Sequence, residues 1–439
     1  MNNNNSESDL NISESTHLYH SKGDIIEDDD EEIKKNRILP FFILVIFIFF
    51  VFIFVVITVV YKFIIKPESE ESNRKNHPEI YISLRERNKI DKYVRNCLDG
   101  ILLDDKKYKK SENPKISIIL PVYNKQNFIL RVLRSIQNQS FKDIEIIFCD
   151  DHSYDNSTNL IEMYQKEDER IILLKQDTNK GTLQNRIAGA FLSKGEYILF
   201  VDPDDLLIEF ILETAYSKAK KYNVDIVQFQ SYNGYFEKSF SIKDTNHSTT
   251  PIYQPELSNF MYYEKGYLSQ TEFFIWGKLI RRNIFIEAIN SIDKYFLNQH
   301  MTLHEDGLTL FILFKKANSY LFIKDYGTFY YYNDNSTLSN LSKRNNINKT
   351  VRNCFLYLEF MFHNTNDTLY EKNMAVFQFK SLLNQYGEIY KKVSKGFDYI
   401  YKVIDLYLNC NIILEEDKKI ILSLKQDIKS IELNSNSLE

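Results

Sequence analysis

The chain has 439 residues, of which 44% are hydrophobic and 14% aromatic, enough for a sizeable core. Its net charge of −5 is uneven, because residues 1–37 carry ten acids and four bases and the rest of the chain is close to neutral. A near-neutral body lacks the basic face that binds phosphates, so we expect no nucleic acid partner. The four cysteines lie far apart without CxxC or Cys–His spacing, which argues against a zinc site or a disulfide framework.

An uncharged apolar run of 21 residues, Phe41–Tyr61, follows the acidic tail. This length matches the ~20 residues that a helix needs to cross a bilayer. A cleavable signal peptide is the alternative, but its apolar part is shorter and nearer the start of the chain. The run therefore predicts one transmembrane helix and attachment to a membrane. Lysines and arginines flank both sides, and the closer cluster before the helix favours a cytoplasmic N-terminus.

After a charged segment with a short helical pattern near Ile80–Leu103, apolar runs begin to alternate with segments of helical spacing. Strands that are apolar throughout and alternate with helices predict a parallel sheet covered on both faces. The predicted strands are Ile116–Leu120, Ile144–Cys149, Ile171–Leu174 and Tyr197–Val201.

Acidic and amide side chains follow the ends of these strands, in "PVYN", "DDHSYDNST", "QDTNKG" and "DPDD". The carboxyl ends of parallel strands share one edge of the sheet, where ligands bind in open α/β folds. The last segment holds Asp202, Asp204 and Asp205 directly after a buried strand. Such crowded carboxylates are tolerable around Mn²⁺ or Mg²⁺, which proteins hold with one or two carboxylates and substrate phosphates. The alternative is that one of them, Asp205 in particular, only caps a helix beginning near Leu206.

Five segments now occur in order: "ISIILPVYN", "DDHSYDNST", "NKGTLQNRIAGAFLSKGEYILFVDPDD", "FFIWGKLIRRNIF" and "HEDGLTLFILF". Together they resemble the family 2 glycosyltransferases of GT-A fold, over about Lys115 to Asn340. The resemblance implies an α/β, Rossmann-like domain with a mainly parallel sheet. It also implies a nucleotide-sugar donor, a divalent metal as cofactor, and transfer with inversion at the anomeric carbon.

The resemblance assigns roles to residues on the donor side. Pro121 and Tyr123 look like the floor and stacking wall of the base pocket, and Asp151 resembles the carboxylate that hydrogen-bonds a uracil ring. Asp150 is expected to stabilise the loop "DDHSYDNST" in which it lies. On the phosphate side, Arg186 lies where the family places an arginine near the diphosphate, Asp202 looks like the ribose-side carboxylate, and Asp204 looks like the metal ligand. For Arg186 the alternative is an arginine on a helix surface.

An inverting transfer needs a base for the acceptor hydroxyl, placed opposite the leaving diphosphate. The stretch "HEDGL" offers Glu305 and Asp306 at the start of a predicted helix, although acids there also favour the helix dipole. In the family the aspartate at this position is the base. We therefore predict that Asp306 is the base and that Glu305 orients the acceptor, which is a glycan, lipid or protein.

The Gln-x-x-Arg-Trp motif of processive synthases is absent, because the only tryptophan is Trp276 in "FFIWGKL". The sequence therefore predicts one sugar per encounter. Trp276 is a candidate to stack on an acceptor sugar, and a core or lid role is the alternative. Two other functions remain open: an inactive, membrane-tethered binder of a nucleotide sugar or glycan, and a nucleotidyltransferase. A nucleotidyltransferase would have a glycine-rich, basic loop after the first strand, and the segment "PVYNKQN" at that position is not such a loop.

In a eukaryotic host we expect the catalytic domain in the lumen of the Golgi or endoplasmic reticulum. A glycosylation sequon at Asn156, within the nucleotide loop, argues against this topology. The predicted regions are an acidic disordered tail (1–37), a transmembrane helix (38–61), a stem (62–113), a GT-A domain (114–340) and a helical extension (341–439).

Overall fold

The computed structural model describes residues 84–102, 108–234, 249–258, 274–331, 347–365 and 369–436. All of them belong to the second of two units of the chain, Ile82–Glu439. The predicted acidic tail and the predicted transmembrane helix at Phe41–Tyr61 lie outside the described residues. Within the described ranges, no helix has the length and apolar character needed to span a bilayer.

The first four strands of the sheet are parallel and confirm the predicted strand–helix alternation. They lie in the order β3-β2-β1-β4, and each predicted strand matches an observed one to within two residues. The apolar side chains of the first, second and fourth strands are buried because helices cover both faces of the sheet, and those of the third, at the edge, are mostly half-buried. These elements are β1 (Ile116–Val122), α4 (Ile129–Gln137), β2 (Ile144–Asp150), α5 (Ser157–Gln165), β3 (Ile171–Lys175), α6 (Thr182–Leu192) and β4 (Tyr197–Phe200).

The rest of the sheet is mixed, so the prediction of a mainly parallel sheet is wrong. Strand β8 lies between β4 and β6 and runs antiparallel to both, whereas β6 and β9 are parallel. Strands β5 and β7 each pair antiparallel with β9. These strands are β5 (Leu206–Leu207), β6 (Ile226–Gly234), β7 (Ile252–Tyr253), β8 (Lys278–Arg281) and β9 (Ser319–Tyr331).

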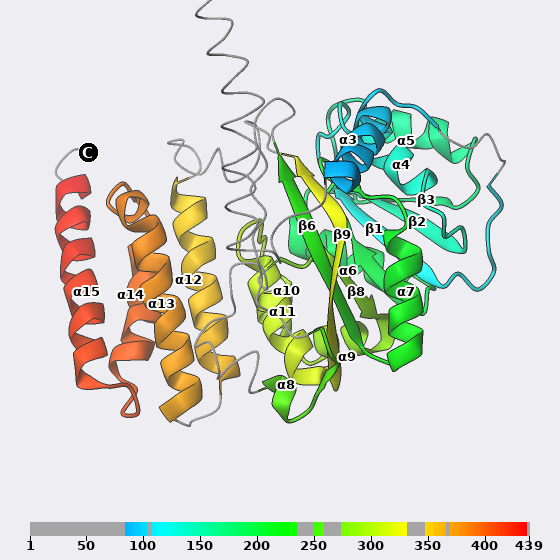
Figure 1. Cartoon of the computed structure of the whole chain (residues 1–439). Helices are drawn as coiled ribbons and strands as arrows, with labels where there is room; N and C mark the ends of the chain where they lie inside the picture. Colours follow the sequence, from blue (N-terminus) through cyan, green and yellow to red (C-terminus); the bar gives the residue numbers. More distant parts are fainter. Residues whose placement is uncertain are drawn as a thin grey trace, which may run out of the picture. The chain divides into compact units, whose positions relative to one another are not determined.

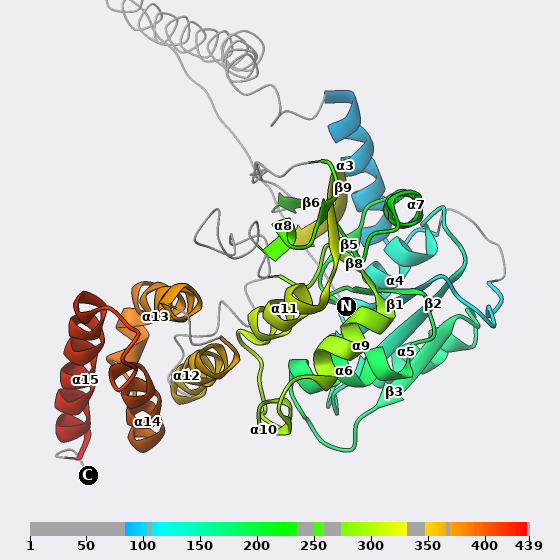
Figure 2. The same cartoon turned by 90° about the horizontal axis from the view of Figure 1, so that it is seen from below.

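Helices cover the two faces of the sheet in separate groups. Figure 2 shows α4 and α7 (Ile211–Tyr222) on one side of the strands and α6 and α9 (Arg282–Asn290) on the other. On the α6 side, Gly189 permits close contact, because a Cβ atom there would lie 2.6 Å from both the Cys149 sulfur and the Ile119 side chain. This close packing places Arg186, one turn earlier on α6, beside the carboxyl ends of the strands.

The C-terminal helices confirm the predicted helical extension, and the first of them, residues 347–364, packs on α11 (Glu305–Lys316) (Figure 1). The ring of Phe360 lies 5.2 Å from that of Phe296 and 6.3 Å from that of Phe311. The apolar side chains of these helices join the core on the α6 side of the sheet. The remaining helices are α8 (Glu256–Ser258), α10 (Lys294–Leu297), α12 (Ile347–Asn364), α13 (Leu369–Tyr390), α14 (Phe397–Leu408) and α15 (Glu415–Asn436).

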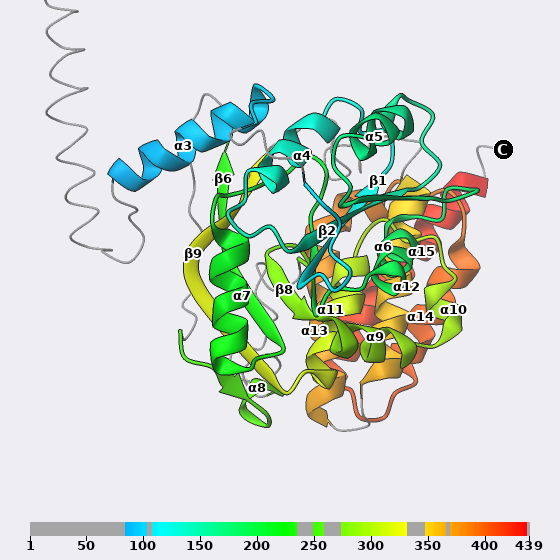
Figure 3. The ribbon, with the colours of Figure 1, turned by 90° about the vertical axis from the view of Figure 1, so that its right-hand side faces the viewer.

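A helix precedes the sheet within the predicted stem. Helix α3 (Leu84–Leu98) lies beside α4 and the ends of β6 and β9 (Figure 3). The Tyr93 hydroxyl donates to the Ser135 carbonyl at 2.9 Å, and Val94 and Cys97 are buried. This part of the predicted stem therefore packs on the catalytic domain.

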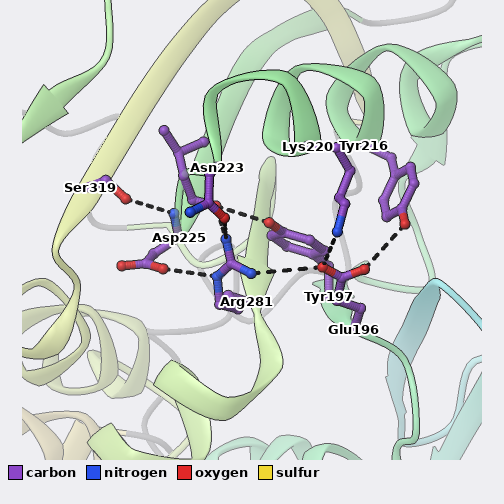
Figure 4. Close-up of polar contacts among 9 residues, drawn as sticks. Glu196, Tyr197, Tyr216, Lys220, Asn223, Asp225, Arg281 and Ser319 are labelled. Atoms are coloured by element: carbon purple, nitrogen blue, oxygen red, sulfur yellow. Dashed lines mark hydrogen bonds and ion pairs between the residues drawn. The ribbon is translucent and has the colours of Figure 1, made fainter.

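A polar network joins the strands at the edge where β4 begins (Figure 4). Arg281 donates to Asp225 at 2.9 Å and lies 3.7 Å from Glu196. Glu196 also accepts hydrogen bonds from Lys220 at 2.8 Å and from the Tyr216 hydroxyl at 3.1 Å. The network ties α7 to β4, β6 and β8 at this edge. The predicted site lies at the opposite ends of β1 to β4.

Candidate active site

The loops that follow β1, β2 and β3 contact one another at one edge of the sheet, as the parallel arrangement predicted. The Asn124 side chain accepts from the Tyr154 backbone N–H at 2.8 Å, which joins the first two loops. Asp150 and Asp151, at the end of β2, are both buried. The Asp150 carboxylate accepts from the Thr158 hydroxyl at 2.6 Å and so holds its own loop, as expected.

The Asp151 carboxylate reaches the neighbouring loop. It accepts from the backbone N–H groups of Lys180 at 2.7 Å and Gly181 at 2.9 Å. Gly181 has φ +88°, a conformation that favours glycine, and a Cβ atom there would lie 2.9 Å from the Met301 carbonyl. Asp151 therefore shapes the predicted base pocket by fixing the loop after β3, and its contact with a uracil stays a prediction.

Pro121 and Tyr123, predicted to bound the base, lie at the carboxyl end of β1 and directly after it. Pro121 is half-buried in β1 and pairs with Cys149 of β2. The Tyr123 side chain is 42% exposed, and its ring meets that of Tyr154 edge-on at 6.4 Å. Tyr154, 76% exposed, was not in the predicted set. Its position in "DDHSYD", directly after the predicted base-binding aspartate, was the available signal.

The three aspartates after β4 have different surroundings. Asp202 and Asp204 are partly exposed at the rim, and the Asp204 Oδ2 atom lies 2.8 Å from the Lys125 ammonium. Asp205 is buried and accepts from the Tyr331 backbone N–H at 3.1 Å. Burial, followed by the charges of Asp204 and Asp202, raises the pKa of Asp205 well above its usual value.

The prediction that Asp205 caps a helix is wrong. The residues after it, Leu206–Leu207, form strand β5, and α7 begins only at Ile211. The position before this helix is held by Phe210, with φ +68°. Asp205 points inward because Tyr331, at the end of β9, supplies a backbone donor that no local pattern reveals.

Arg186 is the centre of the charged cluster, so the alternative of a surface arginine is wrong. Its guanidinium donates to Asp202 at 2.8 Å, to Glu305 at 3.2 Å, and to Asp306. Burial alone would lower the pKa of this guanidinium, but Asp306, Asp202 and Glu305 outweigh burial and raise the pKa. Arg186 thus joins Asp202, the predicted ribose-side carboxylate, to Asp306, the predicted base. Residues predicted to contact the sugar donor and the sugar acceptor therefore lie in one cluster.

Glu305 and Asp306 form the first turn of α11, after His304 with φ +63°. The Asp306 Oδ2 atom accepts from the Ile275 backbone N–H at 3.4 Å. Burial, with the Asp306 charge adding to it, raises the pKa of Glu305 to about 7. Burial also raises the pKa of Asp306, although Arg186 acts in the opposite direction. Raised carboxyl pKa values at a rim are typical of groups that exchange protons.

We expect the stability of the protein to depend on pH through Glu305. The pKa in the folded state, about 7, lies above the ordinary 4.5, so folding favours the protonated form. The free energy of unfolding should therefore fall as pH rises from 4.5 to about 7. Denaturant titrations of wild type and Glu305→Gln across this interval test the claim. The variant should lose less stability over the interval, and parallel curves would contradict the assignment.

Aromatic side chains stand beside the predicted base. The Trp276 ring stacks on Phe274 at 5.0 Å and on Tyr330 at 5.9 Å, and all three are partly exposed. The backbone of Ile275, between the first two, is the donor to Asp306. Trp276 is therefore not a core residue, and this row of rings lies beside the charged cluster near Asp306.

The donor set fits a divalent metal that takes part of its coordination from a substrate. No group of three or more His, Cys, Asp and Glu side chains within the described ranges could hold a metal. Mg²⁺ and Mn²⁺ are commonly held by one or two carboxylates, with water and phosphate oxygens as the other ligands. Asp204, 15% exposed at the rim, can supply such a ligand. Among the described residues, the buried Oδ2 atom of the neighbouring Asp205 has no hydrogen-bond partner.

Lys125 is a second residue of this site, after Tyr154, that the sequence did not predict. It was the basic residue in "PVYNKQN", directly after the first strand, and that stretch was weighed only as a nucleotidyltransferase loop. Its contact with Asp204 joins residues that are 79 positions apart.

A half-parallel sheet with carboxylates, a buried arginine and an exposed tyrosine at its carboxyl rim defines an enzyme of GT-A-like fold. Residues 117–288 match the family model described as glycosyl transferase family 2. This segment is therefore a glycosyl transferase family 2 domain, and the chain is a glycosyltransferase.

Relatives support this assignment. The chain is 29% identical to glycosyltransferase GlyG of Streptococcus pneumoniae over 48% of this chain and 72% of that protein. It is 26% identical to the cholesterol galactosyltransferase of Borreliella burgdorferi over 72% of this chain and 82% of that protein. Among solved structures, residues 1–349 of S. aureus TarS in complex with UDP-GlcNAc match with a TM-score of 0.53 and 16% identity. That match covers 73% of this chain and 89% of the TarS chain and supports the fold.

Proposed function

We propose that the chain transfers a single sugar from a nucleotide-diphosphate sugar, a UDP-sugar, to a hydroxyl of a glycan, lipid or protein acceptor. The transfer inverts the anomeric carbon and depends on Mn²⁺ or Mg²⁺. The observation that carries the proposal is the cluster of Asp202, Arg186, Glu305 and Asp306, which lies beside Asp204 at the rim of the sheet. The similarity to a cholesterol galactosyltransferase and to a poly(ribitol-phosphate) beta-glucosyltransferase, and the UDP-GlcNAc bound to TarS, support the class of donor and acceptor.

The donor binds across the loops after β1 to β4. The exposed ring of Tyr123 stacks on the uracil, Pro121 bounds the base from below, and Asp151 fixes the pocket. Asp202 receives the ribose, and Asp204 holds the metal. When bound, the metal offsets the charge that develops on the departing diphosphate.

The acceptor enters beside Asp306 and the aromatic row at Trp276. Asp306 takes the proton of the acceptor hydroxyl as its oxygen forms a bond to the anomeric carbon. The bond from that carbon to the diphosphate oxygen breaks, and UDP leaves with the electron pair. Arg186 holds the base in place, and Glu305 orients the acceptor. The absence of the Gln-x-x-Arg-Trp motif supports one transfer per encounter.

One observation favours the alternative of an inactive binding protein. Asp204 and Asp306 are both paired with internal cations, Lys125 and Arg186, so the carboxylates are stabilised without a substrate. The two functions differ in their products. A binding protein would bind a nucleotide sugar and release no nucleotide diphosphate.

The test is a panel of nucleotide sugars, incubated with the purified full-length protein, Mn²⁺ and simple sugar or lipid acceptors. Nucleotide-diphosphate release and nucleotide binding are measured together. We expect one UDP-sugar to release UDP in a metal-dependent reaction that the acceptor accelerates. Binding without release for every donor would replace the transferase proposal with the binding alternative.

We expect Asp204→Asn to keep the fold, because the side chain lies at the rim, and to abolish metal-dependent transfer and Mn²⁺-dependent UDP binding. An amide oxygen is a weaker ligand for a hard divalent cation than a carboxylate oxygen is. Calorimetric titration of UDP with and without Mn²⁺ measures the effect. A variant that binds UDP with Mn²⁺ as tightly as wild type would show that Asp204 is not the ligand.

We further propose that Phe41–Tyr61 anchors the enzyme as a single-pass membrane protein. In a eukaryotic host the catalytic domain then faces the lumen of the Golgi or endoplasmic reticulum. In sealed vesicles, a lumenal domain should resist added protease until detergent is present. Digestion without detergent would place the domain on the cytosolic face, where a glycan at Asn156 cannot form.

A further inference from the structure

Lys125 is paired with Asp204, the carboxylate that the proposed function assigns as the metal ligand. Its ammonium is 2.8 Å from the Oδ2 atom of Asp204, and its side chain is 24% exposed. We propose that Lys125 is an internal counter-ion that holds Asp204 until the donor and metal arrive, and that it then binds the donor diphosphate. This inference rests on the proposed function, because it takes Asp204 as the metal ligand.

The backbone around Lys125 is fixed, so the side chain is the part that can move. The Lys125 backbone N–H donates to the Ser157 hydroxyl at 2.9 Å, and the next N–H, of Gln126, donates to Asp155 at 3.0 Å. The Lys125 carbonyl accepts from the N–H of Phe128, at the start of α4. These contacts tie the loop after β1 to the loop after β2. The ammonium therefore pivots from a fixed point at the rim.

The charges around Asp204 make metal and ammonium competitors. Asp202, two residues before Asp204, is paired with Arg186, whereas the Asp204 carboxylate is paired with the Lys125 ammonium at 2.8 Å. A divalent cation on Asp204 would lie within a few ångströms of that ammonium, where like charges repel strongly. Lys125 must therefore leave the carboxylate when the metal binds.

The donor offers Lys125 a second partner. A diphosphate carries more negative charge than one divalent cation neutralises, and a lysine ammonium is a compact charge suited to phosphate oxygens. Arg186 is less available for this task, since its guanidinium already donates to Asp202, Glu305 and Asp306. Lys125 is thus the cation near Asp204 whose partner is exchanged when metal and diphosphate enter together.

The test measures Mn²⁺ binding to the full-length protein from the electron paramagnetic resonance signal of free Mn²⁺, without nucleotide. Lys125→Met removes the ammonium and keeps most of the side-chain volume. It should bind Mn²⁺ about tenfold more tightly than wild type, since a charge-assisted contact no longer has to be broken. With saturating Mn²⁺ the same variant should bind UDP about tenfold more weakly, because the diphosphate loses a partner.

Two further variants separate the charge from other effects. Lys125→Arg keeps the charge and should bind Mn²⁺ like wild type, which excludes a disturbed loop as the cause. Lys175→Met removes a lysine that is paired with Glu162 at the end of β3 and should leave both affinities unchanged. The inference would be overturned if Lys125→Met bound Mn²⁺ and UDP as wild type does. It would also be overturned if Lys125→Arg and Lys125→Met had the same affinities for Mn²⁺ and UDP.

The Asp204→Asn variant distinguishes failure of the Lys125 inference from failure of the proposed function. Loss of Mn²⁺ binding in Asp204→Asn, beside an unchanged Lys125→Met, rejects the role of Lys125 and keeps the metal site. Mn²⁺ binding that Asp204→Asn does not weaken rejects both, because Lys125 then guards no metal ligand.

Discussion

Replacing Asp306 with Asn is expected to slow sugar transfer by roughly 10²–10⁴-fold, the usual cost of removing a general base. The amide cannot take the proton of the acceptor hydroxyl. It can still accept from the Ile275 backbone N–H, so α11 should keep its place. UDP binding with Mn²⁺ should stay near wild type, because the residue faces the acceptor. Initial rates of UDP release and calorimetric UDP titrations measure the two effects.

Glu305→Gln is the matched variant, since Glu305 precedes Asp306 and contacts the same arginine. We expect it to be slower than wild type and faster than Asp306→Asn, because it orients the acceptor without taking the proton. A nearly normal Asp306→Asn beside an inactive Glu305→Gln would move the base to Glu305. Wild-type rates in both variants would exclude this turn of α11 as the source of the base.

Replacing Arg186 with Met is expected to lower the free energy of unfolding by about 3–5 kcal/mol, the cost of leaving buried charges without a partner. Asp202, Glu305 and Asp306 would then face one another without the guanidinium that joins them. Denaturant unfolding followed by tyrosine and tryptophan fluorescence measures the loss. The loss should shrink at acidic pH, where protonation of Glu305 removes one of the three charges.

Arg131→Met is the control for this variant. Arg131 lies on α4 with its guanidinium 5.8 Å from the Phe128 ring, outside the carboxylate cluster. A surface change of this kind should alter stability by about 0.5 kcal/mol or less. Equal losses in the two variants would show that the Arg186 cluster does not hold the site together.

The parallel half of the sheet could be predicted because its signals are local. An apolar run such as Ile144–Cys149 is too short for a helix, and the helical spacing that follows it requires a crossover. The mixed half could not be predicted, since the direction of β8 is decided by its pairing with β4 and β6. No sequence window contains both partners of such a pair.

The candidate site shows the same division between local and distant information. The resemblance assigned Asp202, Asp204 and Asp306 one at a time, and the structure places all three at one rim. Their pairing was not visible, because Arg186 and Asp306 are 120 positions apart. Asp205 was misread for a similar reason, since the donor that holds it inward belongs to a residue 126 positions later.

The stacking of His304 on Tyr357 of α12, with ring centroids 5.5 Å apart, has a consequence for how acceptor choice can change. The turn that carries Glu305 and Asp306 starts at this histidine, so its position depends on helices that come after the sheet. The charge of Lys349, also on α12, acts on Asp151 of the proposed donor pocket. Exchange of the C-terminal helices is therefore expected to shift the turn that carries the proposed base and to change the charge beside the proposed nucleotide pocket at the same time.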